Sequence, residues 1–388
     1  MIGVTDMRMP NRFWPFSFAV SLLALAAAAT LAQPAAPVWT TVAPGVEHAH
    51  FRREAPTKGA WNINVLRIDM TQARLDVIRA RDTAIGLETV TSIATRVGAI
   101  AAINGGYFRT SGDFLGDSTG TLQIDGDVWS EPDRARASVG IVRARRASRL
   151  IFGHVAWQAS IEAGRQKRAV EGLNRARGPN DLVVFTPEFG PATITDDSGI
   201  EVVVRSSRVV EIHDDAGSTA IPRDGFIVSA RGEARDWVRR SLRKGTRVRV
   251  RATLQPADAS RSNPWADAED ILGAGPKLVT SGRVDVTDVR EKMIPTFATD
   301  LHPRTAIASL ADGRALLLVA DGRRSPDRVG LALEDLAKLL IELGAVDAIN
   351  LDGGGSTTMV VKGQVMNFPT DPTGERPVSD AIVVRGPG

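Results

Sequence analysis

An internal repeat constrains the fold of this chain more than any other feature of its sequence. A segment ending in Asn104-Gly-Gly is matched, at a constant offset, by a segment ending in Asn350-Leu-Asp-Gly-Gly-Gly. The identical pairs are Leu87/Leu333, Glu88/Glu334, Gly98/Gly344, Ala99/Ala345, Ala102/Ala348, Ile103/Ile349 and Asn104/Asn350. Each copy predicts an amphipathic helix that ends near a glycine, then a short apolar strand, then a polar glycine turn. Two such units would bring their glycine turns together at strand ends, where α/β sheets commonly bind ligands.

Strand-like alternation precedes the helix in both copies. In the second copy, residues 305–310 and 315–320 flank a turn at Ala311-Asp312-Gly313, which predicts a hairpin. Residues 61–68 and 75–78 begin the first copy in the same way. Each unit is therefore predicted to consist of a hairpin, a helix, a strand and a glycine turn. Because the units lie far apart in the chain, the pattern indicates a duplicated architecture and not a solenoid of neighbouring repeats.

The residues between the copies, from about 110 to 290, predict a strand-rich insert. Its apolar runs alternate with turns that carry Asp, Gly and Pro, and they lie at 122–124, 182–186, 202–204, 209–212 and 247–254. One helix is expected at 234–242. The sequence thus predicts an α/β fold of the α+β kind, with mixed β-sheets, two duplicated hairpin–helix–strand units and this insert. Residues 60–388 are expected to form one domain, preceded by an N-terminal segment at 33–59.

The first 32 residues have the pattern of a secretory signal peptide. Arg8 and Arg12 precede an apolar run at 13–31, and the small residues at 26–32 predict cleavage after Ala32. An uncleaved membrane anchor is the alternative, because the run is almost long enough to span a bilayer. No other stretch approaches that length. The mature chain is therefore expected to have no transmembrane span and to act in the periplasm or outside the cell.

Composition and motif spacing argue against several classes of function. The chain has 388 residues, a net charge of only +3 and no cysteine, which gives no basis for nucleic-acid binding and excludes disulfides, thiolate catalysis and cysteine-ligated metals. The histidines show no zinc spacing, and Asp113, Asp117, Asp125 and Asp127 match no calcium loop. Dinucleotide, P-loop and nucleophile-elbow motifs are also missing. No cofactor is expected, and the presence of a metal is left open.

The second glycine turn carries the groups best suited to hold an anion. Its three glycines permit positive φ and would let backbone N–H groups approach a ligand, while the following hydroxyls add further donors. These residues are Gly353, Gly354, Gly355, Ser356 and Thr357. Asp352 supplies a carboxylate between the strand and this turn.

The first glycine turn, at Asn104, Gly105 and Gly106, ends in aromatic residues instead. Tyr107 is the only tyrosine of the chain, and Phe108 follows it. A sugar ring could stack on either aromatic, or both could pack beneath the turn. Asn104 offers a donor and an acceptor to hydroxyl groups.

Further polar residues stand where the strands of the second unit start and end. His302, Arg304 and Thr305 lie at the start of its first strand, and Asp321 and Arg323 lie at the end of the next. Because hairpin strands are antiparallel, these residues are expected to meet at one end of the hairpin. A C-terminal segment is expected to reach the same rim, with Arg376, Ser379 and Asp380.

Taken in order, these segments resemble the phosphodiester glycosidase family. The segments that carry the resemblance are Asn104-Gly-Gly-Tyr-Phe108, His302-Pro-Arg-Thr-Ala-Ile307, Asp321-Gly-Arg323, Asn350-Leu-Asp-Gly-Gly-Gly-Ser-Thr357 and Arg376-Pro-Val-Ser-Asp380. The similarity extends over roughly residues 60–385 and includes the segment at 270–279. The chain lacks the cysteines of the animal members, so it is similar to their catalytic part only.

The resemblance implies hydrolysis of a sugar-1-phosphodiester at the anomeric carbon, in exopolysaccharide or cell-envelope glycan metabolism. It implies that Asp352 is an essential carboxylate, acting as nucleophile, base or electrostatic support, with His302 or Asp321 completing proton transfer. Arg304 and the glycine N–H groups would neutralise the phosphate. The residues assigned to the substrate are Asn104, Gly105, Gly106, Tyr107, Arg304, Thr305, Arg323, Gly353, Gly354, Gly355, Ser356, Thr357, Arg376, Ser379 and Asp380.

Two other functions remain open at this point. One is a glycoside hydrolase that acts on phosphate-free cell-wall or capsular polysaccharide and uses the same carboxylates. The other is a non-catalytic protein that binds or assembles polysaccharide. Trp129, Trp157, Trp237 and Trp265 would then provide stacking surfaces, although scattered tryptophans more often belong to a core.

Overall fold

The computed structural model describes residues 36–387, except residues 57, 133–135, 145–146, 259–261 and 325. The predicted signal peptide at 1–32 lies outside the described residues, as does the start of the segment at 33–59. The chain from Pro37 onward forms one compact unit. Within the described ranges, no helix is both long enough and apolar enough to cross a membrane.

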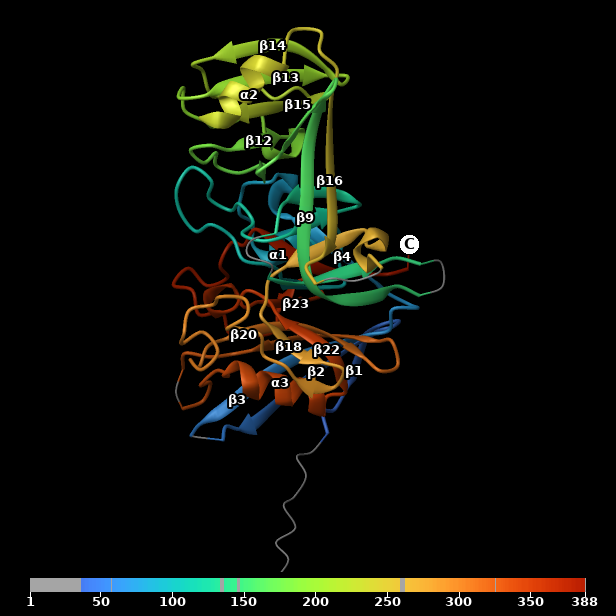
Figure 1. Ribbon diagram of the computed structural model, residues 1–388. Coiled ribbons are helices and arrows are strands. Elements are labelled where there is room, and N and C mark those ends of the chain that lie inside the picture. Colours follow the sequence, from blue (N-terminus) through green and yellow to red (C-terminus); the bar gives the residue numbers. More distant parts are fainter. Residues whose placement is uncertain are drawn as a thin grey trace, which may run out of the picture. The chain divides into compact units, whose positions relative to one another are not determined.

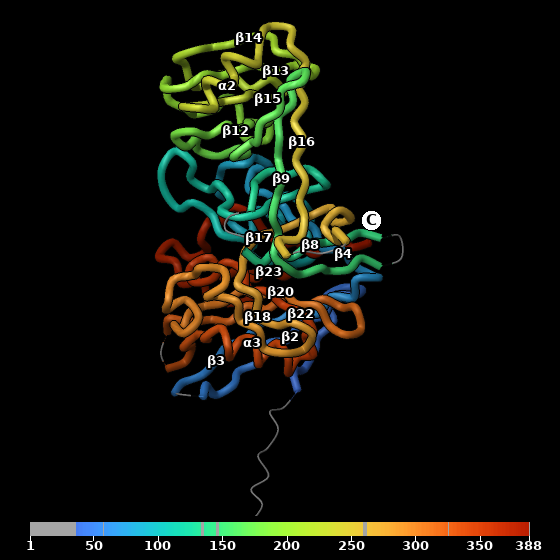
Figure 2. The backbone as a smooth tube through the Cα atoms, viewed as in Figure 1, coloured from blue at the N-terminus to red at the C-terminus, as the bar shows by residue number. Residues whose placement is uncertain are grey.

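The described residues fold mainly into antiparallel β-sheets with three α-helices, which confirms the predicted α+β class. The helices are α1 (Val90–Arg96), α2 (Glu233–Ser241) and α3 (Leu333–Glu342). The largest sheet has eight strands in the order β1 (Thr40–Ala43), β2 (Val46–Glu54), β3 (Ala60–Ile68), β21 (Ala315–Ala320), β20 (Arg304–Leu310), β22 (Ala345–Asn350), β18 (Lys277–Thr280) and β19 (Arg283–Val284). Figure 2 shows β20, β22 and β18 together in the lower part of the view.

A five-stranded sheet carries the first glycine turn. Its order is β24 (Gln364–Val365), β23 (Met359–Val361), β5 (Ala101–Asn104), β25 (Asp380–Arg385) and β4 (Arg74–Arg79). Alternation along the strands sends Ile103 of β5, and Ile307 and Ile349 of the eight-stranded sheet, into one shared core. The opposite faces are covered by helices, α1 over the five-stranded sheet and α3 over the eight-stranded one. The helix–strand–turn parts of the two repeats therefore belong to the two opposing sheets, whereas β3 of the first unit lies in the eight-stranded sheet.

The predicted hairpin of the second unit is confirmed, because β20 pairs antiparallel with β21. The predicted hairpin of the first unit is wrong. β3 and β4 are both strands, but β3 pairs with β2 and β21, whereas β4 pairs with β25 near the C-terminus. The chain crosses from one sheet to the other at the turn near Thr71-Gln72. Burial of apolar residues on both sheets decides this pairing, and the local alternation of β3 and β4 carries no information about it.

The insert contains the strands that the sequence predicts and the predicted helix α2, together with further strands that the sequence analysis did not identify. A seven-stranded sheet contains β10 (Gln166–Ala169), β9 (Arg149–Ala163), β8 (Ala137–Val142), β17 (Asp270–Gly273), β6 (Leu122–Ile124) and β7 (Asp127–Ser130), with β16 (Val248–Pro256) paired to β9. A second five-stranded sheet contains β11 (Gly172–Leu173), β12 (Leu182–Phe185), β15 (Gly225–Ala230), β13 (Ile200–Arg205) and β14 (Arg208–Asp214). Figure 1 shows β9 and β16 running side by side toward that sheet.

Candidate active site

The two glycine turns contact each other through the asparagines that end the repeated strands. Asn104, at the end of β5, donates from Nδ2 to the carbonyl oxygen of Asp352 at 2.6 Å. Asn350, at the end of β22, donates from Nδ2 to the Tyr107 hydroxyl at 2.9 Å. The backbone N–H of Asp352 also donates to the carbonyl of Gly105 at 3.0 Å. Each repeat therefore reaches across to the turn of the other, and the predicted meeting of the two turns is present in the structure.

Buried hydroxyls hold the linking asparagine in place. Thr305 Oγ1 donates to Asn104 Oδ1 at 2.8 Å, and the N–H of Thr358 donates to the same oxygen at 3.1 Å. Thr305 and Thr357 are buried, and their hydroxyl oxygens lie 3.4 Å apart. The sequence assigned these two threonines to substrate binding. In the structure both are buried, and Thr305 holds the side chain of Asn104.

Asp352 is the carboxylate at the junction of the two turns. Its Oδ1 accepts from the N–H of Gly353 at 2.9 Å, which fixes the side chain, and the residue keeps a partly exposed surface. Burial raises the pKa of Asp352 to about 6, although the Ser356 hydroxyl, the Gly353 N–H and the charge of Arg376 oppose this shift. A carboxylate that is held in place, is partly accessible and has a pKa near neutral pH suits a nucleophile or general base.

Two arginine side chains lie against the second glycine turn. A Cβ added at Gly354 would lie 2.9 Å from Arg323 Nη2, and one added at Gly355 would overlap the guanidinium of Arg376. Arg376 is paired with Asp371 at 2.6 Å. Arg323 is exposed and has no hydrogen bond or ion pair within the described ranges. A side chain at either position would displace these guanidinium groups, and the positive φ of Gly354 also favours glycine there.

Arg304 is a third arginine of the site, and its buried guanidinium lies over the Phe297 ring, 5.3 Å from the centroid. It is only 2% exposed, and it donates to the carbonyl oxygens of Leu331, Phe297 and Asp300 at 3.0, 2.9 and 2.8 Å. No carboxylate of the described residues forms an ion pair with it. Burial lowers the pKa of Arg304 to about 10. A buried cation held only by carbonyl groups is costly unless an anion joins it.

The expected anion-binding role of the glycine N–H groups holds for one glycine at most. The N–H of Gly353 donates to Asp352, and the N–H of Gly354 donates to the carbonyl of Pro303 at 2.9 Å. Only Gly355 keeps an N–H with no partner in the described part of the chain. The turn continues into a short 3₁₀ helix at Gly354–Ser356, and only Gly354 has a positive φ. The arginines, and not the backbone, therefore supply the positive charge of the site.

His302 and Asp321, the residues expected to complete proton transfer, differ in accessibility. Burial lowers the pKa of His302, and the charges of Arg304 and Arg323 add to the effect, so the imidazole is neutral near pH 7. Its Nδ1 has no partner within the described residues. Asp321 is only 1% exposed, and its oxygens accept from Asn62 Nδ2 at 2.5 Å and from the N–H of Phe368 at 2.8 Å. His302 is partly exposed and keeps a buried ring nitrogen without a partner in the described part of the chain, whereas Asp321 holds the surrounding loops.

The aromatic residues of the first turn take two different positions. Phe108 packs beside the apolar face of α1. The Tyr107 hydroxyl donates to the carbonyl of Gly275 at 2.7 Å, while the ring lies edge-on to Phe297 and has the Arg136 guanidinium carbon 5.4 Å from its centroid. Burial raises the pKa of Tyr107, and the nearby charge of Asp352 adds to this. Tyr107 is therefore a neutral part of the wall of the site.

Asp380 and Ser379 anchor the first glycine turn from below. Asp380 Oδ1 accepts from the N–H of Gly106 at 2.7 Å, and Oδ2 accepts from Ser379 Oγ at 2.6 Å. The same carboxylate pairs at 3.4 Å with Arg79, which is completely buried. Sequence reasoning missed Arg79, as well as Phe297 and Arg136, because none of them belongs to a motif. Arg79 ends strand β4, next to Val77 and Ile78. A charged residue beside these apolar residues was the only sequence signal for it.

Substitution of Gly105 by alanine should loosen this turn. An added Cβ would overlap the Asp380 carboxylate, and overpacking of this kind typically costs about 1–3 kcal/mol. We expect Gly105→Ala to lower the melting temperature and the activity together. Gly386→Ala is the matched control, because a Cβ there meets no atom within 4 Å. Equal melting temperatures for both variants would contradict the close packing of Gly105 on Asp380.

Comparisons with known proteins agree with this arrangement. The model of the family described as phosphodiester glycosidase matches residues 198–385, which include the whole second unit. The bovine (Bos taurus) N-acetylglucosamine-1-phosphodiester alpha-N-acetylglucosaminidase is 26% identical over 313 residues, which cover 70% of this chain and 56% of the relative. The chain thus spans little more than half the length of that relative.

Two solved structures share the fold over most of the chain. A hypothetical protein from Synechocystis has a TM-score of 0.76 and 25% identity, with coverage of 88% of this chain and 62% of that one. A putative exported protein from Burkholderia pseudomallei has a TM-score of 0.74 and 27% identity, with coverage of 85% and 75%. Together these similarities relate the chain to the phosphodiester glycosidase family, whose model matches residues 198–385.

Proposed function

We propose that this protein hydrolyses a glycosyl phosphodiester at the anomeric carbon, the type of bond named in its bovine relative. The observation that supports this most strongly is the group of three arginines around the Asp352 turn. Arg304 and Arg323 have no carboxylate partner in the described part of the chain, so an incoming phosphodiester would supply the missing negative charge. Guanidinium groups bind phosphate oxygens in pairs and hold them in a fixed orientation.

The reaction follows from these positions. The bond between the anomeric carbon and the bridging phosphate oxygen breaks, and its electron pair stays on the phosphate, which leaves as a monoester. Arg304, Arg323 and Arg376 stabilise the charge that develops on this leaving group. Asp352 supports the positive charge that develops on the sugar, either directly or through an activated water. Water supplies the hydroxyl of the released sugar and the proton that the products require.

A phosphate-free glycoside fits the site less well. An alkoxide leaving group needs a proton from a general acid, whereas a phosphate monoester leaves as a stable anion. The carboxylate of Asp321 is occupied by Asn62 and Phe368 and has almost no exposed surface. A neutral glycoside would also leave the charges of Arg304 and Arg323 unbalanced. The arginine group therefore favours the phosphodiester over the plain glycoside.

We further propose that the enzyme acts in the periplasm or outside the cell, on exopolysaccharide or cell-envelope glycan. The signal-peptide pattern at residues 1–32 supports this location. A relative of similar fold, from Burkholderia pseudomallei, is described as a putative exported protein. Fractionation of the native host and N-terminal sequencing of the mature protein test this point. A protein found only in the cytoplasm with residues 1–32 intact would contradict it.

The proposed reaction is tested on small substrates with the purified protein. We expect it to release free sugar from a chromogenic or UDP-linked sugar-1-phosphodiester, and to leave the matching nitrophenyl glycoside without phosphate almost untouched. Arg304→Ala should lose most of this activity. Turnover of the plain glycoside alone, with a bell-shaped pH profile, would identify a conventional glycosidase instead. No turnover of any phosphodiester by the wild type would contradict the proposed reaction.

Arg323 should contribute to phosphate binding without contributing to the fold. Its side chain is exposed and has no partner within the described ranges, so Arg323→Gln should leave the melting temperature unchanged. We expect kcat/KM on the phosphodiester to fall by about 10²-fold, as for removal of one charge-stabilising donor. Arg324→Gln, at the adjacent exposed position, is the control and should behave like the wild type. Equal losses in both variants would point to a general surface-charge effect.

The activity should depend on the ionisation of Asp352. Because burial raises the pKa of Asp352 to about 6, the base or nucleophile is protonated below that value. We expect kcat/KM to fall about tenfold per pH unit below pH 6. Stability should move in the opposite direction. The folded chain holds this proton more tightly than the unfolded chain does, so the stability that Asp352 contributes decreases as the pH rises from about 4 to about 6.

A profile of kcat/KM against pH, measured between pH 4 and 9, checks this expectation. Unfolding measured at the same pH values, for the wild type and Asp352→Asn, checks the stability part, because the variant has no carboxyl to titrate. An acid limb near pH 4 would show that Asp352 titrates like an ordinary carboxyl group.

A further inference from the structure

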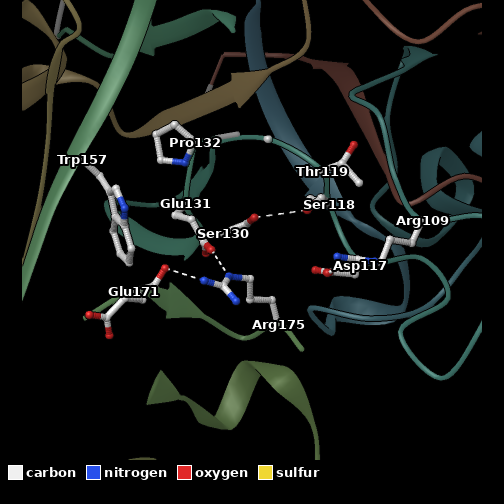
Figure 3. Close-up of a pocket in the computed structure, with 11 residues that line it drawn as sticks. Arg109, Asp117, Ser118, Thr119, Ser130, Glu131, Pro132, Trp157, Glu171 and Arg175 are labelled. Atoms are coloured by element: carbon white, nitrogen blue, oxygen red, sulfur yellow. Dashed lines mark hydrogen bonds and ion pairs between the residues drawn. The ribbon is translucent and has the colours of Figure 1, made fainter. Parts of the chain in front are cut away.

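A separate polar pocket of about 510 Å³ is lined almost entirely by residues of the insert. Figure 3 shows Trp157 on one side of it and Arg109 with Asp117 on the other, with Glu131 and Arg175 between them. None of the glycine-turn residues or arginines of the candidate active site lines this pocket. The family resemblance assigned no residue here, and Trp157 was singled out in the sequence only as a possible stacking surface.

The floor of the pocket is rigid because its charged groups are fixed by one another. Glu131 pairs with Arg175 Nε and accepts from the N–H of Leu173 at 3.0 Å. Arg175 Nη1 also pairs with Asp181 at 2.9 Å. Burial, which would lower the pKa of Arg175, is outweighed by these carboxylates, so its pKa is raised and it stays charged. The guanidinium and carboxylate planes are therefore held in place before any ligand arrives.

Asp117 is the group of the pocket whose hydrogen bonding is incomplete. It is 4% exposed and lines the cavity, yet its only side-chain partner is Arg109 Nε, 3.2 Å from Oδ2. Its Oδ1 has no partner in the described part of the chain. Burial raises the pKa of Asp117 to about 7, against the charges of Arg109 and Arg79. An almost completely buried carboxyl that faces a cavity with one oxygen free is suited to bind a hydroxyl group of a ligand.

The chemistry of the lining favours an uncharged sugar over an ion. Three carboxylates, of Asp117, Glu131 and Glu171, stand beside two guanidinium groups, of Arg109 and Arg175. The charges nearly cancel, so an anionic or a cationic ligand gains little. One flat indole, planar polar groups and the hydroxyls of Thr119 and Ser130 match the apolar ring face and equatorial hydroxyls of a pyranose. The volume is sufficient for one or two sugar rings.

The pocket is joined to the candidate active site by one short segment of chain. The N–H of Thr119 donates to the carbonyl of Tyr107 at 2.9 Å. Ser118 Oγ donates to Asp380 Oδ2 at 3.4 Å, and Asp380 holds the N–H of Gly106. Part of the pocket lining, at residues 117–120, thus follows shortly after the first glycine turn and shares its anchor.

We propose that this pocket is a carbohydrate-binding subsite that holds an uncharged pyranose unit of a glycan by stacking on Trp157 and hydrogen bonding to Asp117. The proposal rests on the proposed function only in taking a glycan as the substrate. It assigns to the pocket the selection of the glycan, while the arginines around Asp352 bind the phosphodiester.

Direct binding tests the subsite without any need for turnover. Isothermal titration of the full chain with neutral hexasaccharides of glucose (β1,4-, β1,3- and α1,4-linked) should show binding of at least one of them, and a hexagalacturonate should bind more weakly. Trp157→Ala and Asp117→Asn should each weaken that binding at least about tenfold, while Trp157→Phe, which keeps a ring, should retain more of it. Trp237→Ala, at a half-buried tryptophan of α2 outside the pocket, is the matched control and should bind like the wild type.

The outcomes separate this subsite from the proposed reaction. Trp157→Ala and Asp117→Asn should hydrolyse a small sugar-1-phosphodiester at the wild-type rate, which also shows that both variants are folded. Loss of glycan binding in these variants supports the subsite even if no phosphodiester is ever cleaved. Wild-type glycan binding in both variants, or no binding of any neutral hexasaccharide by the wild type, would overturn it, whatever the activity on small substrates.

Discussion

Asp352→Asn should reduce kcat on a sugar-1-phosphodiester by about 10²- to 10⁴-fold, the range expected for loss of a nucleophile or general base. The substitution keeps the shape of the side chain, and the amide oxygen of asparagine can still accept from the N–H of Gly353, as Oδ1 does at 2.9 Å. The charge disappears, and with it the support for a developing positive charge on the sugar. The KM should change little, because the arginines and not Asp352 bind the phosphate.

The matched control for this prediction is Asp347→Asn. Asp347 stands on β22, the strand that leads to Asp352, and pairs at its partly exposed surface with Lys277 at 3.4 Å. Removal of that charge should leave kcat within about twofold of the wild type, as for most surface substitutions. Steady-state kinetics and melting temperatures of both variants decide the matter. An Asp352→Asn enzyme that keeps more than a tenth of the wild-type kcat would exclude Asp352 as the essential carboxylate.

Arg79→Met should cause the largest loss of stability of any single substitution considered for this chain, about 3–5 kcal/mol. The guanidinium of Arg79 is 1% exposed and donates to the carbonyl oxygens of Thr83, Ser379, Ala84 and Gly116. It is also the ion-pair partner of Asp380. Methionine would fill a similar volume but would leave a buried carboxylate and several carbonyl groups without their donor.

Chemical unfolding followed by circular dichroism measures this loss. Arg52→Met is the control, because Arg52 and its partner Asp327 are 57% and 64% exposed, and such a surface pair contributes about 0–1 kcal/mol. The activity of Arg79→Met should also fall, since Asp380 positions the first glycine turn through the N–H of Gly106. A difference below about 1 kcal/mol between the two variants would contradict a central role of Arg79 in the fold.

Much of the second repeat could be predicted from sequence because its structure is local. The hairpin of β20 and β21 is encoded by two apolar runs around an Ala-Asp-Gly turn, and α3 is encoded by a helical period of leucines. The pairing of β3 and β4 was not predictable in this way. Both strands are visible as apolar alternations, but their partners β21 and β25 lie hundreds of residues away in the chain. Nothing in a short window specifies such a partner.

The candidate site also has features that follow from local sequence and features that depend on contacts between distant segments. Glycines at Gly353–Gly355 and a nearby aspartate predict a polar glycine turn from the sequence alone, and Asn104 and Arg323 follow from the repeat and from the hairpin geometry. The use of the N–H groups by Asp352 and Pro303, and the absence of a carboxylate beside Arg304 in the described residues, depend on side chains from several sheets. Because of these contacts, the positive charge of the site is assigned to the arginines and not, as the sequence predicted, to the backbone N–H groups.

The sequence by itself determined that this protein contains two copies of a helix–strand unit, that each copy ends in a polar glycine turn, and that Asp352 belongs to one of these turns. Local hydrophobic periodicity and turn residues are sufficient for such statements, because they depend on neighbouring residues alone. Only the tertiary structure decided which strands pair, that Arg79 and Asp380 form a buried anchor, and that Arg304 is a buried cation without a carboxylate partner in the described part of the chain. These properties arise from desolvation and from contacts between distant segments, which exist only after the two sheets have packed together.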